Sequence, residues 1–407
     1  MRQLQKGLTL IPYLPDTAER WRLELELQSL LGAVWFATRG PAAPETGQAY
    51  DRAKRLCEQL GDDKALVPVL SGQSTYHLCR CELAPMKRIG EDLLRLGTEK
   101  DHAVSRMVGH STLGFCLTYL SEFANAIDQF ERALALYDPV AHPALASVAA
   151  LDIRTTSLAN MSWCLVFRGY PDQAVSRSNQ ALDWSRKLRN SNVLAFALLH
   201  ASICLQLQRA DEAALEVLKE QIPLCTEQRF PVYLALAHLM QGYLLATRGE
   251  TEQGLALARA GFQNLTATGF LLGRPYYLGF LAQSCARAGE VDEAFELIDQ
   301  ALAETEQTSE RWVEAELLRL KGEWLTTHQR GGYARPEVYL EQAISVAQAQ
   351  GARLLELRSI VSLCRCLGKH GRSAELRKLL MPICNSFQEG FGTPDLQDAR
   401  LILSSLT

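Results

Sequence analysis

Cysteine spacing is the first feature of the sequence that could carry metal chemistry. Eleven cysteines occur in 407 residues, and four of them form two Cys-x-Cys pairs, Cys79 with Cys81 and Cys364 with Cys366. Residues two apart on a helix point about 200° apart around its axis, so neither pair can chelate one metal ion. We therefore predict that the cysteines are small packing residues and that the chain holds no metal.

Histidines and glycine-rich motifs give no catalytic site either. His200 and His238 lie in segments rich in Leu and Ala and have no Asp or Glu three or four residues downstream. A metal or acid–base role needs converging partners, so each is interpreted as a core or groove histidine. Gly368 and Lys369 are followed by His370 and lack the upstream glycine of a phosphate-binding loop. Neither Gly-x-Gly-x-x-Gly nor Gly-x-Ser-x-Gly occurs, so the sequence predicts no enzyme and no cofactor.

Charged residues of both signs alternate over residues 310–321. The members of this stretch are Glu310, Arg311, Glu314, Glu316, Arg319 and Lys321. At helical spacing such a stretch is typical of a solvated face on which residues three or four apart form ion pairs. A charged contact on the concave side of the fold is the alternative interpretation.

Composition excludes two classes of partner. Lys and Arg number 42 and Asp and Glu 46, which gives a net charge of −4, and 47% of the residues are hydrophobic. A nucleic-acid-binding surface needs a basic excess that this balance does not provide. No apolar run approaches the length of about 20 residues that a membrane span needs, and residues 1–7 do not resemble a secretory signal. We expect a cytoplasmic protein with reduced thiols that contacts neither nucleic acid nor membrane.

The elements that position these residues repeat along the chain. A turn signal returns about every 40 residues, and between the turns the apolar residues follow helical spacing without the alternation of a strand. The turns lie at Gly169, Arg209, Gly249, Gly289 and Gly371, with a looser Gly331-Gly332 loop between the last two. Small residues, such as Ala126 and Ala133 on either side of Phe130, allow antiparallel helices to approach closely. We predict an all-α solenoid of about nine to ten helix pairs that forms one domain over residues 1–407.

The unit over residues 113–139 resembles the tetratricopeptide repeat, at a slightly longer period than is usual for that family. In order and spacing, a series of segments resembles the C-terminal repeat region of large bacterial signalling proteins. Those proteins carry a predicted ATPase of the AAA/STAND kind, often behind a nucleotide-cyclase or winged-helix module. The segments are residues 40–45 (GPAAPE), 55–61 (RLCEQLG), 169–174 (GYPDQA), 273–276 (GRPY), 310–317 (ERWVEAEL) and 389–396 (EGFGTPDL). The resemblance implies a right-handed superhelix that serves as a regulatory arm without catalytic residues.

The same resemblance implies a binding face, because the first helix of each tetratricopeptide-like pair lines the concave surface. The residues that this places in the groove are Phe115, Tyr119, Trp163, Phe167, Tyr243, Tyr276, Gln283 and Arg287. Aromatic rings with an occasional Arg are typical of binding hot spots, although packing between adjacent repeats is the alternative for any one ring. We expect a protein or peptide partner, or a small-molecule effector, in the groove and an upstream NTPase or cyclase as the regulated module. A purely structural scaffold or oligomerisation arm is the alternative function.

Residues 1–14 are expected to form the second helix of a pair whose first helix is absent. Leu4, Leu8, Leu10 and Ile11 would then be left half covered, since a solenoid normally ends in a polar capping helix. We therefore expect the chain to be part of a longer protein.

Overall fold

The computed structural model describes residues 2–40, 42–143, 152–328, 335–368 and 372–406. These residues form α-helices and one short 3-10 helix (Ile11–Tyr13), and no strand occurs among them. The helices are α1 (Arg2–Leu10), α2 (Ala18–Arg39), α3 (Pro44–Leu60), α4 (Asp63–Cys79), α5 (Leu83–Glu99), α6 (Ala103–Tyr119), α7 (Phe123–Ala135), α9 (Ile153–Arg168), α10 (Pro171–Leu188), α11 (Ser191–Leu207), α12 (Asp211–Glu227), α13 (Pro231–Thr247), α14 (Thr251–Ala267), α15 (Arg274–Arg287), α16 (Val291–Thr308), α17 (Glu314–Thr327), α18 (Pro336–Gln350), α19 (Arg353–Leu367), α20 (Ser373–Asn385) and α21 (Pro394–Ser405).

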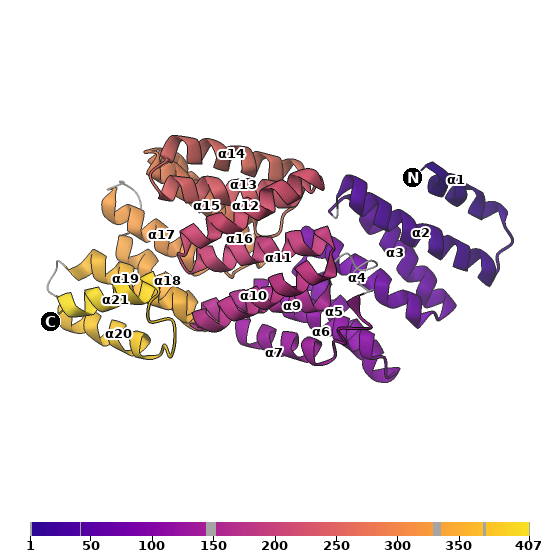
Figure 1. Ribbon diagram of the computed structural model, residues 1–407, viewed down its shortest axis with the longest axis horizontal. Helices are drawn as coiled ribbons and strands as arrows, with labels where there is room; N and C mark the ends of the chain where they lie inside the picture. Colours follow the sequence, from indigo (N-terminus) through magenta and orange to yellow (C-terminus); the bar gives the residue numbers. More distant parts are fainter. Residues whose placement is uncertain (1, 41, 144–151, 329–334, 369–371, 407) are drawn as a thin grey trace.

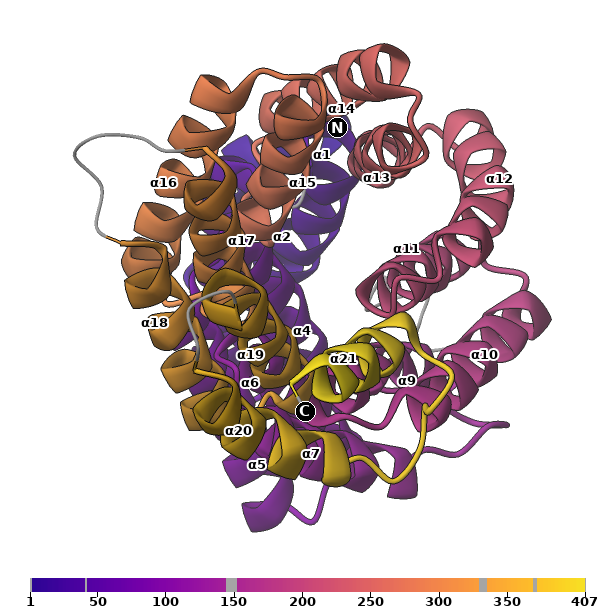
Figure 2. The same cartoon turned by 90° about the vertical axis from the view of Figure 1, so that its left-hand side faces the viewer.

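Consecutive helices pack as antiparallel pairs, from α2 with α3 to α19 with α20 (Figure 1). Nine such pairs lie in the described part of the chain, with α1 before them and α21 after them. The first helices of most successive pairs also pack on one another, as in α9 with α11 and α11 with α13. Seen end-on, the pairs wind around a central axis, with the first helices on the inside and the second helices outside (Figure 2). The predicted all-α solenoid of helix pairs is confirmed.

Left-handed turn residues end the first helices where the sequence predicted turns. The φ angles are 85° at Gly169, 97° at Gly249 and 85° at Gly289, a region that glycine adopts at little cost. Arg209 takes the equivalent place with a φ of 58°, which is uncommon for a residue with a side chain. The predicted Gly331-Gly332 loop and the turn at Gly371 lie outside the described residues.

Small residues set the distance between the two helices of a pair. In the α13–α14 pair, a Cβ atom at Gly242 would lie 2.4 Å from the backbone nitrogen of Ala258. In α6, a Cβ atom at Gly114 would lie 2.7 Å from the Phe130 ring, and Phe130 is wholly buried. The small positions of the repeat therefore admit either a facing backbone or an aromatic ring.

The superhelix makes contact with itself after five helix pairs. The amide of Leu271, before α15, donates to the carbonyl of Cys79 at the end of α4, and that of Arg311, before α17, donates to Tyr119 at the end of α6. Further along, α19 packs on α9. The second turn of the solenoid thus lies directly on the first, and this closure decides which part of the inner face stays open.

The N-terminal residues differ in part from the expectation. Helix α1 packs along α2, Ile11 is buried and Leu4 and Leu8 are half-buried, while Leu10 is exposed. Among the described helices, none is long and apolar enough to cross a membrane.

Candidate functional site

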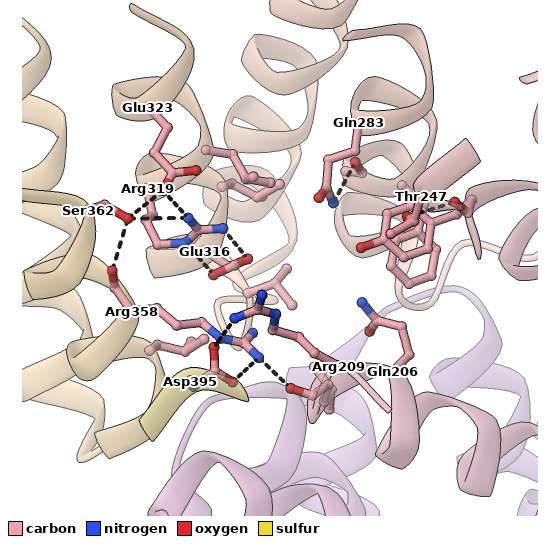
Figure 3. A pocket seen from close by; sticks show the side chains of 18 of the residues that line it. Gln206, Arg209, Thr247, Gln283, Glu316, Arg319, Glu323, Arg358, Ser362 and Asp395 are labelled. Atoms are coloured by element: carbon pink, nitrogen blue, oxygen red, sulfur yellow. Dashed lines mark hydrogen bonds and ion pairs between the residues drawn. The ribbon is translucent and has the colours of Figure 1, made fainter. Parts of the chain in front are cut away.

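A cavity of about 640 Å³ lies on the inner face of the solenoid, beside the axis (Figure 3). Its lining comes from the first helices α9, α11, α13, α15, α17 and α19, and from the start of α12 and of α21. Residues of both superhelical turns meet here, because α19 and α21 lie against the part of the chain that contains α9 and α11. The cavity therefore spans the seam between the turns.

One wall of the cavity carries charged side chains of α17 that pair with one another. The Arg319 guanidinium donates to both carboxylate oxygens of Glu316, at 2.9 and 2.7 Å, and lies 2.7 Å from Glu323 Oε1. The Ser362 hydroxyl, from α19, donates to the same Glu323 oxygen at 2.6 Å. Burial acts to raise the pKa of Glu316, but the Arg319 charge outweighs it and the pKa falls to about 2. Glu316 and Arg319 are thus a fixed ion pair, as is visible in Figure 3.

A second ionic group joins α19 and α21 to the preceding turn. Arg358 donates to both oxygens of Asp395, at 3.0 and 2.8 Å, and to the carbonyl of Leu207 at 2.5 Å. Arg209 approaches Asp395 at 3.3 Å and Asp398 at 2.9 Å. The contacts of Arg358 with Leu207 and of Arg209 with Asp395 and Asp398 connect residues 151 to 189 positions apart in sequence, so they hold the seam between the two turns.

The opposite wall, from α11, α13 and α15, carries aromatic rings and side-chain amides. The Tyr276 hydroxyl donates to Gln206 Oε1 at 2.6 Å, and the Tyr243 ring stacks on Phe280 with centroids 4.4 Å apart. Gln283 Nε2 donates to the carbonyl of Gly279 within its own helix, at 3.2 Å, and the amide oxygen of Gln283 has no hydrogen-bond partner among the described residues. This wall therefore offers amide groups and ring faces to an occupant.

Five of the eight residues predicted for the groove line this cavity. They are Phe167, Tyr243, Tyr276, Gln283 and Arg287. The other three, Phe115, Tyr119 and Trp163, do not line it and are buried between helices instead. For these three the structure follows the alternative of packing between repeats, and their placement in an open groove is corrected.

Trp312 explains why the early part of the inner face is closed. It precedes α17, is almost wholly buried, and reaches from the second turn into the aromatic face of the first. Its ring stacks on Trp163 with centroids 5.5 Å apart and meets the edge of Tyr119 at 5.8 Å. The Trp312 side chain thus fills the concave surface between α6 and α9, and the cavity begins beyond this residue.

The charged stretch at residues 310–321 does not form a solvated face. Glu310 is wholly buried, Lys321 is mostly buried and pairs with Asp299, and Glu316 and Arg319 line the cavity. The favoured interpretation is therefore wrong for these four residues, and the alternative of a concave contact holds for Glu316 and Arg319. The predicted pairing of residues three or four apart is present in Arg319 with Glu316 and Glu323.

Sequence reasoning missed the second ionic group, Arg209, Arg358, Asp395 and Asp398. A signal for Arg209 was available, because it replaces glycine at a repeated position with positive φ, where a side chain costs backbone strain. Arg358 lies in α19 and Asp395 and Asp398 lie in α21, and no local pattern connects them with Arg209. Only the closure of the superhelix brings them together.

The cysteines, His200 and His238 behave as packing residues. None of the eleven cysteines, all of which are described, forms a disulfide, and nine are buried. His200 is also buried, with Nδ1 bound to the Phe196 carbonyl at 3.0 Å, and burial lowers its pKa to about 3. His238, in α13, is half-buried, and burial lowers its pKa as well.

One described cluster could in principle ligate a metal, namely Cys285, Glu290 and Glu293. The Arg259 guanidinium pairs with Glu290 and lies 2.5 Å from Glu293. Burial raises the pKa of the Cys285 thiol to about 12, which disfavours the thiolate that a metal would need. An arginine already neutralises this cluster, so we assign it no metal.

Comparison with known proteins gives one distant sequence relative. No protein family profile matches the chain. A curated relative, an uncharacterised protein of Rhizobium meliloti (strain 1021), is 23% identical over 360 residues, which cover 84% of this chain and 33% of that protein. The chain thus spans about a third of the length of the curated relative it matches.

Solved structures share the helical-repeat fold. NprR in complex with its cognate peptide NprX has a TM-score of 0.60 and 14% identity, covering 83% of this chain and 94% of that chain. A Rap protein complexed with competence and sporulation factor has a TM-score of 0.56 and 12% identity, covering 96% of this chain and 98% of that chain. The Rap conjugation gene regulator of plasmid pLS20, in complex with the Phr* peptide, has a TM-score of 0.53 and 11% identity, covering 93% and 98%. The fold is a tetratricopeptide-type solenoid, as the sequence indicated.

Proposed function

We propose that the chain is a non-catalytic sensor whose central cavity binds a short peptide or an extended segment of a partner protein. The observation that carries this proposal is the position of the cavity, which is lined by both turns of the superhelix and lies beside its axis. Its volume of about 640 Å³ falls within the range of about 300–1,000 Å³ found for ligand sites.

The chemistry of the two walls supports an occupant of peptide type. The acidic groups of the α17 and α21 wall are taken up by arginines, so no set of free carboxylates and bases is left for acid–base catalysis there. The facing wall supplies Tyr243, Tyr276 and the amides of Gln206 and Gln283. Rings and amides suit side chains and main-chain groups of an extended segment. Two of the fold neighbours are complexes with named peptides, NprX and Phr*.

The regulated activity belongs to the same proposal. An occupant that contacts both walls would hold α11, α13 and α15 of one turn against α19 and α21 of the next. Binding would therefore change how firmly the seam is closed, and an attached or partner NTPase or cyclase would respond to that change. A purely structural scaffold is the second candidate, but a scaffold has no need of a polar cavity of this size at its axis.

A selection experiment tests peptide binding. The purified chain is immobilised and incubated with a pool of random synthetic hexapeptides, and retained peptides are identified by mass spectrometry. We expect a family of related peptides to be enriched over beads alone. Gln283→Trp should fill the cavity and reduce retention at least tenfold, whereas Gln180→Trp, on the exposed face of α10, should leave it unchanged.

Two results would contradict the proposal. One is a pool from which nothing is enriched, and the other is retention that the cavity-filling Gln283→Trp does not alter. The regulatory part is tested separately, by measuring nucleotide turnover of a longer protein that contains the chain, with and without the selected peptide. Unchanged turnover at saturating peptide would exclude control of that module.

A further inference from the structure

We propose that the cavity recognises a carboxylate group of its occupant and that Arg287, at the end of α15, is the residue that binds it. This inference rests on the proposed function and names the chemistry of one group of the ligand. Five arginines line the cavity, and they differ in whether they already form an ion pair with a carboxylate of the protein.

Four of the five arginines already form ion pairs with carboxylates of the protein. Arg319 pairs with Glu316 and Glu323, Arg358 with Asp395, and both Arg209 and Arg365 with Asp398. Charge-assisted pairs of this kind, partly removed from water, hold their geometry and offer few free donors. A ligand carboxylate would have to break one of them to bind there.

Arg287 is the arginine of the cavity that makes no ion pair with any carboxylate in the described part of the chain. Its Nη1 donates one hydrogen bond, to the carbonyl of Gln283 in its own helix, at 3.2 Å. The guanidinium lies over the ring of Tyr243, 5.6 Å from its centroid. A cation–π contact of this kind uses no N–H donor, so apart from the bond to Gln283 the donors of Arg287 have no hydrogen-bond partner among the described residues. The Arg287 side chain is exposed to the cavity, and its guanidinium can donate two parallel hydrogen bonds to a planar acceptor such as a carboxylate.

Asp211 is the acidic residue of the cavity that has no ion pair among the described residues. It is the first residue of α12. Four charged groups act on it electrostatically, namely Arg209 in the loop before α12, Arg287 from α15, Arg358 from α19 and its neighbour Glu212. Burial raises the pKa of Asp211, and the arginines only partly oppose that effect. A carboxylate arriving at Arg287 would raise this pKa further, so its binding should be coupled to proton uptake.

Asp211 thus separates two ligand classes. If the ligand brings a carboxylate to Arg287, Asp211 repels it, and Asp211→Asn should strengthen binding and reduce its dependence on pH. If the ligand instead brings an ammonium or guanidinium group to Asp211, the same substitution should weaken binding. Three arginines and only one other acidic residue act electrostatically on Asp211, so the local charge favours an anion and the first outcome is the one we expect.

Three hexapeptide pools test the inference on the complete chain. The first has free C-terminal carboxylates and no Asp or Glu, the second has C-terminal amides and no Asp or Glu, and the third has C-terminal amides with Asp and Glu allowed. We expect enrichment from the first or the third pool and at least tenfold less from the second. The first pool would identify a chain terminus as the source of the carboxylate, and the third an acidic side chain.

Variants then place the carboxylate at Arg287. For a selected peptide we expect Arg287→Gln to raise Kd at least tenfold, Arg287→Lys to have an intermediate effect because it keeps the charge without the fork, and Asp211→Asn to lower Kd. Arg132→Gln, on the exposed face of α7, is the matched control and should leave Kd unchanged. Equal enrichment from the second pool, or weaker binding by Asp211→Asn, would overturn the carboxylate inference while leaving peptide binding intact. Absence of enrichment from all three pools would instead remove the proposed function itself, and with it this inference.

Discussion

Trp312 stacks on Trp163 with ring centroids 5.5 Å apart and an angle of 15° between the rings, although the two residues belong to different turns of the superhelix. Both side chains are almost wholly buried. The indole nitrogen of Trp163 donates to the carbonyl of His200 at 3.0 Å, and that of Trp312 donates to Glu310 at 2.7 Å. Each ring therefore has its polar atom satisfied, and the pair joins successive turns by an apolar contact rather than by charges.

Replacing Trp312 with Ala should destabilise the chain by about 3–5 kcal/mol, because it removes a large buried ring and leaves a cavity between the turns. Equilibrium urea unfolding measures the change. Trp21→Ala is the control, since Trp21 is only half-buried in α2 near the N-terminal end, and its effect should be clearly smaller. A loss of stability in Trp312→Ala no larger than in the control would mean that the turns are not held together at this contact.

The Arg358–Asp395 pair should respond differently to single and double substitution. Both side chains are nearly buried, at 11% and 5% exposure, so Asp395→Leu alone leaves an arginine charge without compensation at a cost of about 3–5 kcal/mol. Arg358→Met combined with Asp395→Leu removes both charges and should cost less than the sum of the two single changes. Urea unfolding of the four proteins gives the coupling energy between the residues. Strictly additive losses would show that the pair is not coupled.

The helix pairs and their turns could be predicted from the sequence because they depend on local chemistry. Glycine suits the positive φ at residues 169, 249 and 289. The small residues Ala126 and Ala133 are wholly buried between the two helices of their pair, as their spacing indicated. These features involve residues within one repeat, so a single repeat is enough to recognise them.

The closed part of the inner face could not be predicted in the same way. Whether Trp163 faces a groove or a second turn of the solenoid depends on the pitch of the superhelix, which is the sum of small rotations between many pairs. Trp312 lies far from Trp163 in sequence, and no repeat pattern connects the two. Residues beyond this contact, such as Tyr243 and Gln283, reach the cavity because the second turn leaves that stretch uncovered.

Glu310 should make stability depend on pH. Its wholly buried carboxyl accepts hydrogen bonds from Trp312, the Gly273 amide and the Cys81 thiol, and burial raises its pKa to about 7. An unfolded glutamate titrates near 4.3, so the folded chain keeps a proton that the unfolded chain releases between about pH 4.5 and 7. This contribution to stability is complete below pH 4.5 and is lost as the pH rises through 7, by about 3–4 kcal/mol.

Glu310→Gln cannot titrate and therefore isolates this effect. The free energy of unfolding of the wild-type chain minus that of the variant should decrease steadily from pH 5 to pH 8. A difference that is independent of pH would show that Glu310 has an ordinary pKa in the folded chain.

His200 should give a dependence of the opposite sign. Its ring lies between Phe196 and Trp163, with centroids 3.9 and 4.5 Å away, and burial lowers its pKa to about 3. The unfolded histidine takes up a proton near pH 6.5, so stability is complete above that value and is lost as the pH falls, by about 2–3 kcal/mol at pH 4.5. His200→Met keeps much of the volume without a titrating group. The wild-type minus variant difference should fall on acidification, and a flat difference between pH 7 and 4.5 would contradict the assignment.

The close approach of α13 and α14 gives the last prediction. Gly242→Ala improves the helix propensity of α13 by about 1 kcal/mol, yet its Cβ atom would lie 2.4 Å from the Ala258 nitrogen and 2.5 Å from the Gly254 carbonyl oxygen. Backbone atoms cannot move aside as a side chain can, so the two helices must separate, and we expect a net loss of about 1–3 kcal/mol in urea unfolding. Gly279→Ala in α15 is the matched control, because its nearest neighbour is a Leu317 methyl group at 3.1 Å that can rotate away. The control should change stability little, and an equal or stabilising effect at Gly242 would mean that the pair is not packed backbone to backbone.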